Sequence, residues 1–170
     1  MKSMNQRLMM PRIITGAIMM SVLIYGVVLM SISQEWTEPP DDQGILPTAL
    51  TAISIGMLPM IAVLRKVSLG SLALIAPPVA RSTEEVSEAA LDAALSKATG
   101  RYTTGTIIGL ALSESIAIYG FMIAFLTHEL AAYVPNALIA LTMMAVQFPR
   151  EAGLLNLLGE PERAALARRS

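Results

Sequence analysis

The chain has 170 residues, of which 54% are hydrophobic and 15% charged, with 12 Lys and Arg against 13 Asp and Glu. A soluble domain of this length ordinarily carries more charge. Because the acidic and basic residues balance, the chain lacks the excess of basic residues that is typical of nucleic-acid-binding proteins. Cysteine is absent and His128 is the single histidine, which argues against a disulfide framework, a metal site and a Ser-His-Asp site. We therefore expect no catalytic residues, no metal and no cofactor, and we predict that the protein is not an enzyme.

The charged residues leave four long stretches of the chain almost free of charge. These stretches are residues 13–32, 47–64, 104–126 and 131–148. Each has roughly 18–23 residues, close to what an α-helix needs to cross ~30 Å of hydrocarbon. The sequence therefore predicts an all-α membrane protein, a single domain over residues 1–170 that forms a four-helix transmembrane bundle of two hairpins.

The basic residues predict the orientation of this bundle. Lys and Arg occur before the first predicted span, between the second and third, and after the fourth, while the other two connections have none. Because basic loops stay on the cytoplasmic side, both termini and the central loop are expected in the cytoplasm. We expect an integral protein of a bacterial inner membrane.

The two predicted hairpins resemble each other. SVLIYG at residues 21–26 is similar to SIAIYG at 115–120, and the second and fourth spans share a similar stretch that begins at Pro47 and Pro135. Both hairpins would begin on the same side, as in a parallel internal repeat. A small apolar alphabet also produces such matches by chance, so the sequence leaves both explanations open.

The cytoplasmic parts contain two further predicted elements. Residues 82–98 form an amphipathic pattern that opens with a capping box, Ser82 and Glu85, and is followed by Gly100. This helix could pack on the inner end of the bundle or bind a cytoplasmic partner. The tail, residues 150–170, is expected to form two short amphipathic turns along the inner surface.

Glu114 is the only ionisable side chain inside any predicted span, and it lies near the middle of the third. A charge at that depth costs several kcal/mol, and no Lys or Arg in another span can pair with it. Burial away from water disfavours the ionised form, so we expect Glu114 to hold its proton unless an ion or partner reaches it. Two roles stay open: ion handling, or a hydrogen bond that only fixes helix packing.

Small side chains follow one face of the same span. They are Gly105, Gly109, Ser113, Ala117 and Gly120. Such a stripe lets a second helix approach closely. It predicts self-association through this face, as a homo-oligomer or as part of a larger membrane complex.

Residues 109–126, GLALSESIAIYGFMIAFL, resemble the carboxylate-bearing helix of the ring-forming c subunit of rotary ATP synthases and ATPases. That helix typically reads G-x-A-x-x-E-A-x-x-I-Y-G before an apolar run. The resemblance implies that Glu114 binds the translocated proton or sodium ion. It also places Ser115 and Tyr119 where sodium-binding members have auxiliary ligands.

The sequence thus favours a small, oligomerising protein of the lipid bilayer whose Glu114 binds a proton, or less readily sodium, in a c-subunit-like manner. The alternative is a structural or assembly protein that does not transport. In that case residues 82–98 and the tail would recruit a cytoplasmic partner, and Glu114 would serve packing alone.

Overall fold

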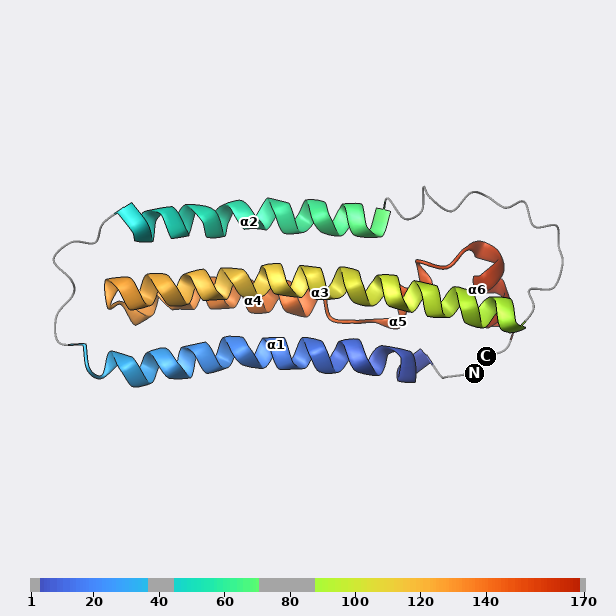
Figure 1. The fold of residues 1–170 in the computed structure, drawn as a ribbon, viewed down its shortest axis with the longest axis horizontal. Helices are drawn as coiled ribbons and strands as arrows, with labels where there is room; N and C mark the ends of the chain where they lie inside the picture. The colour runs from blue at the N-terminus through green and yellow to red at the C-terminus, as the bar shows by residue number, and fades with distance from the viewer. Residues whose placement is uncertain (1–3, 37–44, 71–87, 169–170) are drawn as a thin grey trace.

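The computed structural model describes residues 4–36, 45–70 and 88–168, with side chains from 64 to 70 excepted. Its helices are α1 (Met4–Ser33), α2 (Ile45–Gly70), α3 (Glu88–Thr127), the 3-10 turn η1 (Leu130–Ala132), α4 (Tyr133–Val146), α5 (Glu151–Leu155) and α6 (Glu160–Ala167). The described residues contain helices and turns but no strand, which confirms the all-α class (Figure 1).

Three helices are long and apolar enough to cross a membrane, over Asn5–Ser33, Ile45–Val63 and Glu88–Thr127. The full helices α1, α2 and α3 contain the first three predicted spans and extend beyond them. The fourth predicted span, residues 131–148, contains a shorter apolar helix, Leu130–Val146. The chain is thus an integral membrane protein built from apolar helices.

The four longer helices run side by side, with α3 at the centre (Figure 1). α3 contacts α1, α2 and α4, and α1 also touches α4. α1 and α3 run in one direction along the bundle, while α2 and α4 return in the other (Figure 1). Both hairpins therefore have the same direction, as the predicted parallel repeat requires, although the duplication itself stays a prediction.

The basic end of the bundle gathers the beginnings of α1 and α3 with the two tail helices. Arg7 of α1 forms a salt bridge with Asp92 of α3 at 2.5 Å. Arg12 donates from Nε to the carbonyl of Pro149, just after α4, at 3.3 Å. Arg7 and Arg12 thus link three segments that lie far apart in the sequence.

The sequence predicts a separate cytoplasmic helix over residues 82–98. For the described part of that segment this prediction was wrong, because residues 88–98 belong to α3. α3 continues without a break through Gly100 from Glu88 to Thr127, 40 residues or ~60 Å. A glycine inside a helix costs only about 1 kcal/mol relative to alanine, which the burial of Leu91 and Leu95 outweighs. The predicted capping box at Ser82 and Glu85 lies outside the described residues.

The tail packs on this extension of α3. Its α5 and α6, the two short elements predicted for residues 150–170, bring Leu154 and Leu158 against Leu91 and Leu95, and Leu8 of α1 completes the cluster. The apolar face of this part of α3 is thus occupied by the chain's own tail. Of the two interpretations of the predicted 82–98 helix, its described part favours packing on the bundle.

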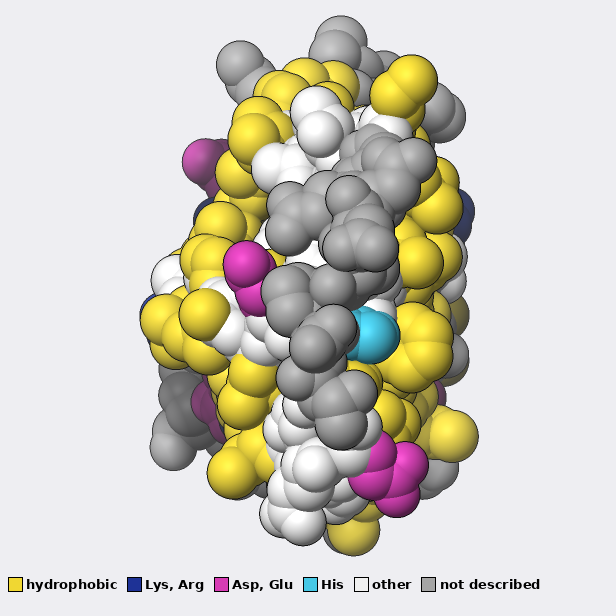
Figure 2. All heavy atoms as spheres, turned by 90° about the vertical axis from the view of Figure 1, so that its left-hand side faces the viewer, with side chains coloured by type: hydrophobic (Ala, Val, Ile, Leu, Met, Phe, Trp, Pro, Cys, Tyr) yellow, Lys and Arg dark blue, Asp and Glu magenta, His cyan; other side chains and the backbone are white. Residues whose placement is uncertain are grey.

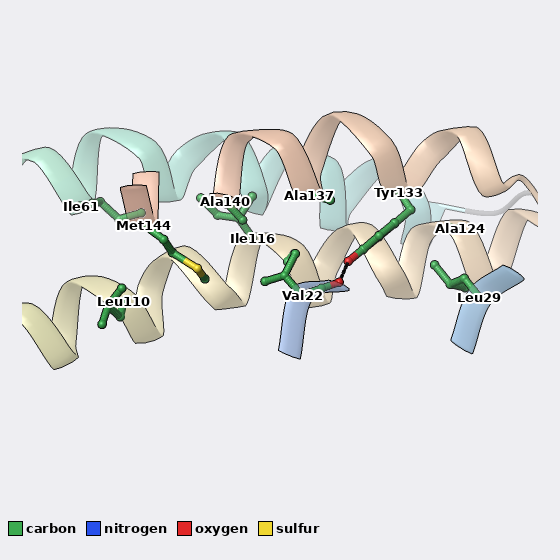
Figure 3. Close-up of a cluster of buried hydrophobic side chains, with 11 residues drawn as sticks. Val22, Leu29, Ile61, Leu110, Ile116, Ala124, Tyr133, Ala137, Ala140 and Met144 are labelled. Atoms are coloured by element: carbon green, nitrogen blue, oxygen red, sulfur yellow. Dashed lines mark hydrogen bonds between the residues drawn. The ribbon is translucent and has the colours of Figure 1, made fainter. Parts of the chain in front are cut away.

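A second apolar cluster joins α1, α2, α3 and α4 in the middle of the bundle (Figure 3). Tyr133 at the start of α4 is buried there, and its hydroxyl donates to the carbonyl of Val22 on α1. Its ring lies against Gly26, where an added methyl group would come 3.2 Å from Cε1. This contact fixes α1 against α4 next to the position of Ser21.

A tight turn closes the opposite end of the bundle. His128 has a φ of 56°, and the amide of Glu129 donates to the carbonyl of Ala124 at 3.2 Å, the pattern of a Schellman cap. The His128 ring stacks on Trp36 from the end of α1, with centroids 5.1 Å apart. Figure 2 views this end, where acidic and apolar side chains face outward and Lys and Arg are seen only at the edges.

Large apolar side chains also cover much of the outer surface of the bundle. Those that are more than a third exposed include Met20, Leu23, Ile24, Ile55, Ile108, Ile118, Met122, Val134 and Leu138. A soluble monomer rarely exposes contiguous apolar surface on this scale. Lipid chains are the solvent in which such a surface is stable.

Candidate functional site

Glu114 lies on the side of α3 that faces α1. Its Oε1 accepts hydrogen bonds from the hydroxyl of Ser21 at 2.5 Å and from the hydroxyl of Tyr25 at 3.0 Å. These two donors stand four residues apart, so that they lie on one face of α1, one turn above the other. Two helices therefore build the site, with the acid on one and both hydroxyl groups on the other.

The Ser21 hydroxyl has two neighbours but only one proton. Its Oγ lies 2.7 Å from the carbonyl oxygen of Ile18 and 2.5 Å from Glu114 Oε1. If Glu114 is ionised, Ser21 can donate to one of these acceptors and not to both. If Glu114 is protonated on Oε1, its carboxyl donates to Ser21 while Ser21 donates to Ile18, and every contact is a hydrogen bond.

The surroundings of the carboxyl group are apolar and partly open. Glu114 is half-buried, and the exposed side chains of Met20, Ile24 and Ile118 flank the site along both helices. The Tyr25 ring packs edge-on against Phe121 with centroids 5.9 Å apart. Among the described residues Glu114 forms no ion pair, as expected from the lack of basic residues in the spans.

The residues next to Glu114 in the sequence do not join it. Ser113 is fully buried on another face of α3, where it donates to the carbonyl of Gly109 at 2.9 Å and accepts from Gln147 Nε2 at 3.0 Å. The Ser115 hydroxyl donates to its own helix, to the carbonyl of Ala111 at 3.0 Å. Intrahelical bonds of this kind are common for serine within transmembrane helices.

Tyr119 and Ser115, the predicted auxiliary ligands, make no hydrogen bond to Glu114 within the described part of the chain. Tyr25 and Ser21, which do so, were not predicted as site residues. One sequence signal pointed to them: SVLIYG at residues 21–26 repeats the spacing of SIAIYG at 115–120. The hydroxyl groups at the acid come from the first copy of this pattern, and a role of Ser115 and Tyr119 as ligands stays a prediction.

The small-residue stripe of α3 packs against residues of the same chain. A methyl group added at Gly109 would overlap the Gln147 side chain, and one added at Gly120 would overlap Asn136 Cβ. Ala117 is fully buried, and Gly105 borders a cavity at the basic end of the bundle. Because α4 occupies this stripe, the face predicted for self-association is not free.

Comparison with known families supports the resemblance seen in the sequence. A family model that describes the c subunit of ATP synthase matches residues 80–127, which contain all of α3 and Glu114. The match covers less than a third of the 170-residue chain. Comparisons with curated proteins and with solved structures found no match. Over residues 80–127, therefore, the chain is similar to the ATP synthase c subunit.

Proposed function

We propose that this small membrane protein takes up and releases a proton at Glu114, in the manner of the c subunit that its third helix resembles. The observation that carries this proposal is the contact of Glu114 Oε1 with Ser21 at 2.5 Å, beside the 2.7 Å contact of Ser21 with Ile18. A proton on Glu114 turns both contacts into hydrogen bonds. Loss of that proton requires the Ser21 hydroxyl to turn from Ile18 to the carboxylate.

The spacing of the oxygens favours a proton over sodium. Oxygen ligands held at about 2.0–2.1 Å around the small Mg²⁺ ion lie roughly 2.9 Å apart, and sodium is larger. Oxygens 2.5 Å apart are too close to share such a cation, whereas O–H···O hydrogen bonds span about 2.5–3.0 Å. The arrangement therefore supports proton binding as the function of this site.

We further propose that α4 forms the fourth crossing, with both termini in the cytoplasm of a bacterium, and that the protein acts within a homo-oligomer or a larger membrane complex. A single acid can carry a proton across a membrane only if its surroundings alternate between two sides. A neighbouring protomer can supply that alternation. Since α4 covers the small-residue stripe, the outward faces of the bundle are the surfaces left for assembly.

Labelling with a hydrophobic carbodiimide in membranes tests proton exchange at Glu114. The reagent reacts with protonated carboxyl groups, and Glu114 is half-buried among lipid-facing side chains. We expect one label per chain, mapped to Glu114 by mass spectrometry, with a rate that falls as the pH rises and does not respond to sodium. Absence of labelling at every pH would refute proton exchange. Protection from labelling by sodium would show that the site binds sodium instead of a proton.

A Tyr25→Phe substitution is expected to raise the rate of Glu114 labelling at high pH. Hydrogen bonds to an ionised acceptor are roughly twice as strong as those to a neutral one, so loss of the 3.0 Å bond from Tyr25 weakens the ionised form more. The measurement is the labelling rate of wild type and variant across pH.

Tyr119→Phe is the matched control, because it removes a tyrosine hydroxyl that lies on the same helix as Glu114 and makes no hydrogen bond to it among the described residues. Its labelling profile should coincide with that of the wild type. A shift in Tyr119→Phe and none in Tyr25→Phe would reverse the assignment of the site and restore the ligand predicted from the sequence.

A further inference from the structure

A cavity of about 390 Å³ opens at the inner end of the bundle, between α3, the end of α4 and α5. Its size falls within the roughly 300–1,000 Å³ typical of small-ligand sites. It lies apart from the contacts of Glu114, and nothing in the proton-binding role requires it.

The cavity is lined by both apolar and polar side chains. One wall includes the apolar side chains of Ile61, Ile108 and Val146, which come from three of the predicted spans, as do the polar lining residues Thr106 and Gln147. The other is formed by Arg150 and Asn156, which belong to the tail. The cavity therefore crosses the predicted boundary between hydrocarbon and cytoplasm.

The apolar wall is open to the bilayer at two of its three residues, while Ile61 is buried. Ile108 is 47% exposed and Val146 is 51% exposed, and Phe148 at the rim is 39% exposed. Side chains at this depth contact lipid chains. A hydrocarbon chain that entered the cavity would cover apolar surface which the protein itself leaves open.

The polar wall offers donors for an anion. The Arg150 guanidinium is exposed and forms no hydrogen bond or ion pair with another described residue, while its backbone amide donates to the Tyr102 hydroxyl at 3.1 Å. Tyr102 Oη accepts that bond and keeps its own proton available for donation. Arginine is well suited to phosphate because its planar group offers parallel N–H donors.

We propose that this cavity binds one anionic phospholipid from the inner leaflet, with the phosphate at Arg150 and Tyr102 and part of one acyl chain along Ile61, Ile108 and Val146. A soluble phosphate would use the polar half alone and leave the apolar half empty. A neutral lipid would fill the apolar half without using the charge of Arg150.

Native mass spectrometry of the full chain in mild detergent tests this site, with phosphatidylglycerol, phosphatidylcholine and inorganic phosphate as probes. We expect one phosphatidylglycerol per chain, bound about fivefold more tightly than phosphatidylcholine, because one basic residue near an anionic headgroup contributes roughly that factor. Arg150→Gln should abolish the preference. Arg168→Gln, which removes the same charge from the end of α6, should leave it unchanged.

Two variants test whether the acyl chain enters the cavity. Gly105→Leu on α3 and Ala152→Leu on α5 fill it from different walls and should weaken retention of both lipids roughly tenfold, the effect of excluding about two methylene groups. Equal binding of the two lipids by the wild type would overturn the proposal, as would equal effects of Arg150→Gln and Arg168→Gln. Full competition by inorganic phosphate, or unchanged retention in whichever filled variant folds, would overturn it as well.

Discussion

A Glu114→Gln variant is expected to lose carbodiimide labelling completely while it keeps the fold of the wild type. Glutamine has nearly the same shape as glutamate, and its carbonyl oxygen can accept from Tyr25 and, once the Ser21 hydroxyl turns from Ile18, from Ser21 as well. The amide offers no carboxyl group to the reagent and cannot exchange a proton. The measurement is the mass of the labelled chain, together with the thermal unfolding midpoint followed by circular dichroism in mild detergent.

Glu129→Gln is the control for this experiment, because it removes a carboxyl group from the turn between α3 and η1 rather than from the middle of the bundle. That variant should label at the wild-type rate. Label remaining within the helices of Glu114→Gln would mean that a second acid reacts there. A clearly lower unfolding midpoint in Glu114→Gln than in the wild type would contradict the expectation that glutamine preserves the fold.

A Gly120→Ala variant is expected to lose roughly 1–3 kcal/mol of stability, the usual cost of overpacking a filled interface. The added methyl group would overlap Asn136 Cβ, which is close to the backbone of α4 and cannot rotate away. The two helices would have to separate, and the fully buried Ala124 and Ala140 would lose contacts. Thermal unfolding in mild detergent measures the loss.

Gly56→Ala provides the matched comparison. Gly56 also lies within a long helix, but nothing comes within 4 Å of an added methyl group, so the higher helix propensity of alanine should leave stability unchanged or raise it by up to about 1 kcal/mol. Equal losses in the two variants would contradict the packing of α4 on the Gly120 face of α3.

Much of the helical architecture could be predicted because the charge-free stretches mark the apolar helices directly. The positions at which these helices begin and end could not be predicted in this way. α1 begins at Met4 rather than at residue 13, since Arg7 and Arg12 continue a helix once it has left the hydrocarbon. α3 runs through Gly100 because contacts with the tail, far away in the sequence, stabilise the extended helix.

The acid of the candidate site could be predicted from the sequence, but its hydrogen-bond partners could not. Glu114 could be found from composition, since it is the single acid in the spans. Its hydrogen-bond partners depend on how α1 and α3 are rotated against each other, which an apolar sequence specifies weakly. Ser115 and Tyr119 lie close to Glu114 along the helix, but Ser21 and Tyr25 lie close to it in space.

Infrared difference spectroscopy tests most directly whether Glu114 carries a proton inside the membrane at neutral pH, as we propose. Wild type and Glu114→Gln would be compared in lipid vesicles, where a protonated carboxyl group gives a C=O stretching band separate from those of carboxylates and amides. We predict that this band is present in the wild type, absent in the variant, and lost from the wild type as the pH rises. A spectrum that shows only ionised carboxylate for Glu114 at neutral pH would contradict the account.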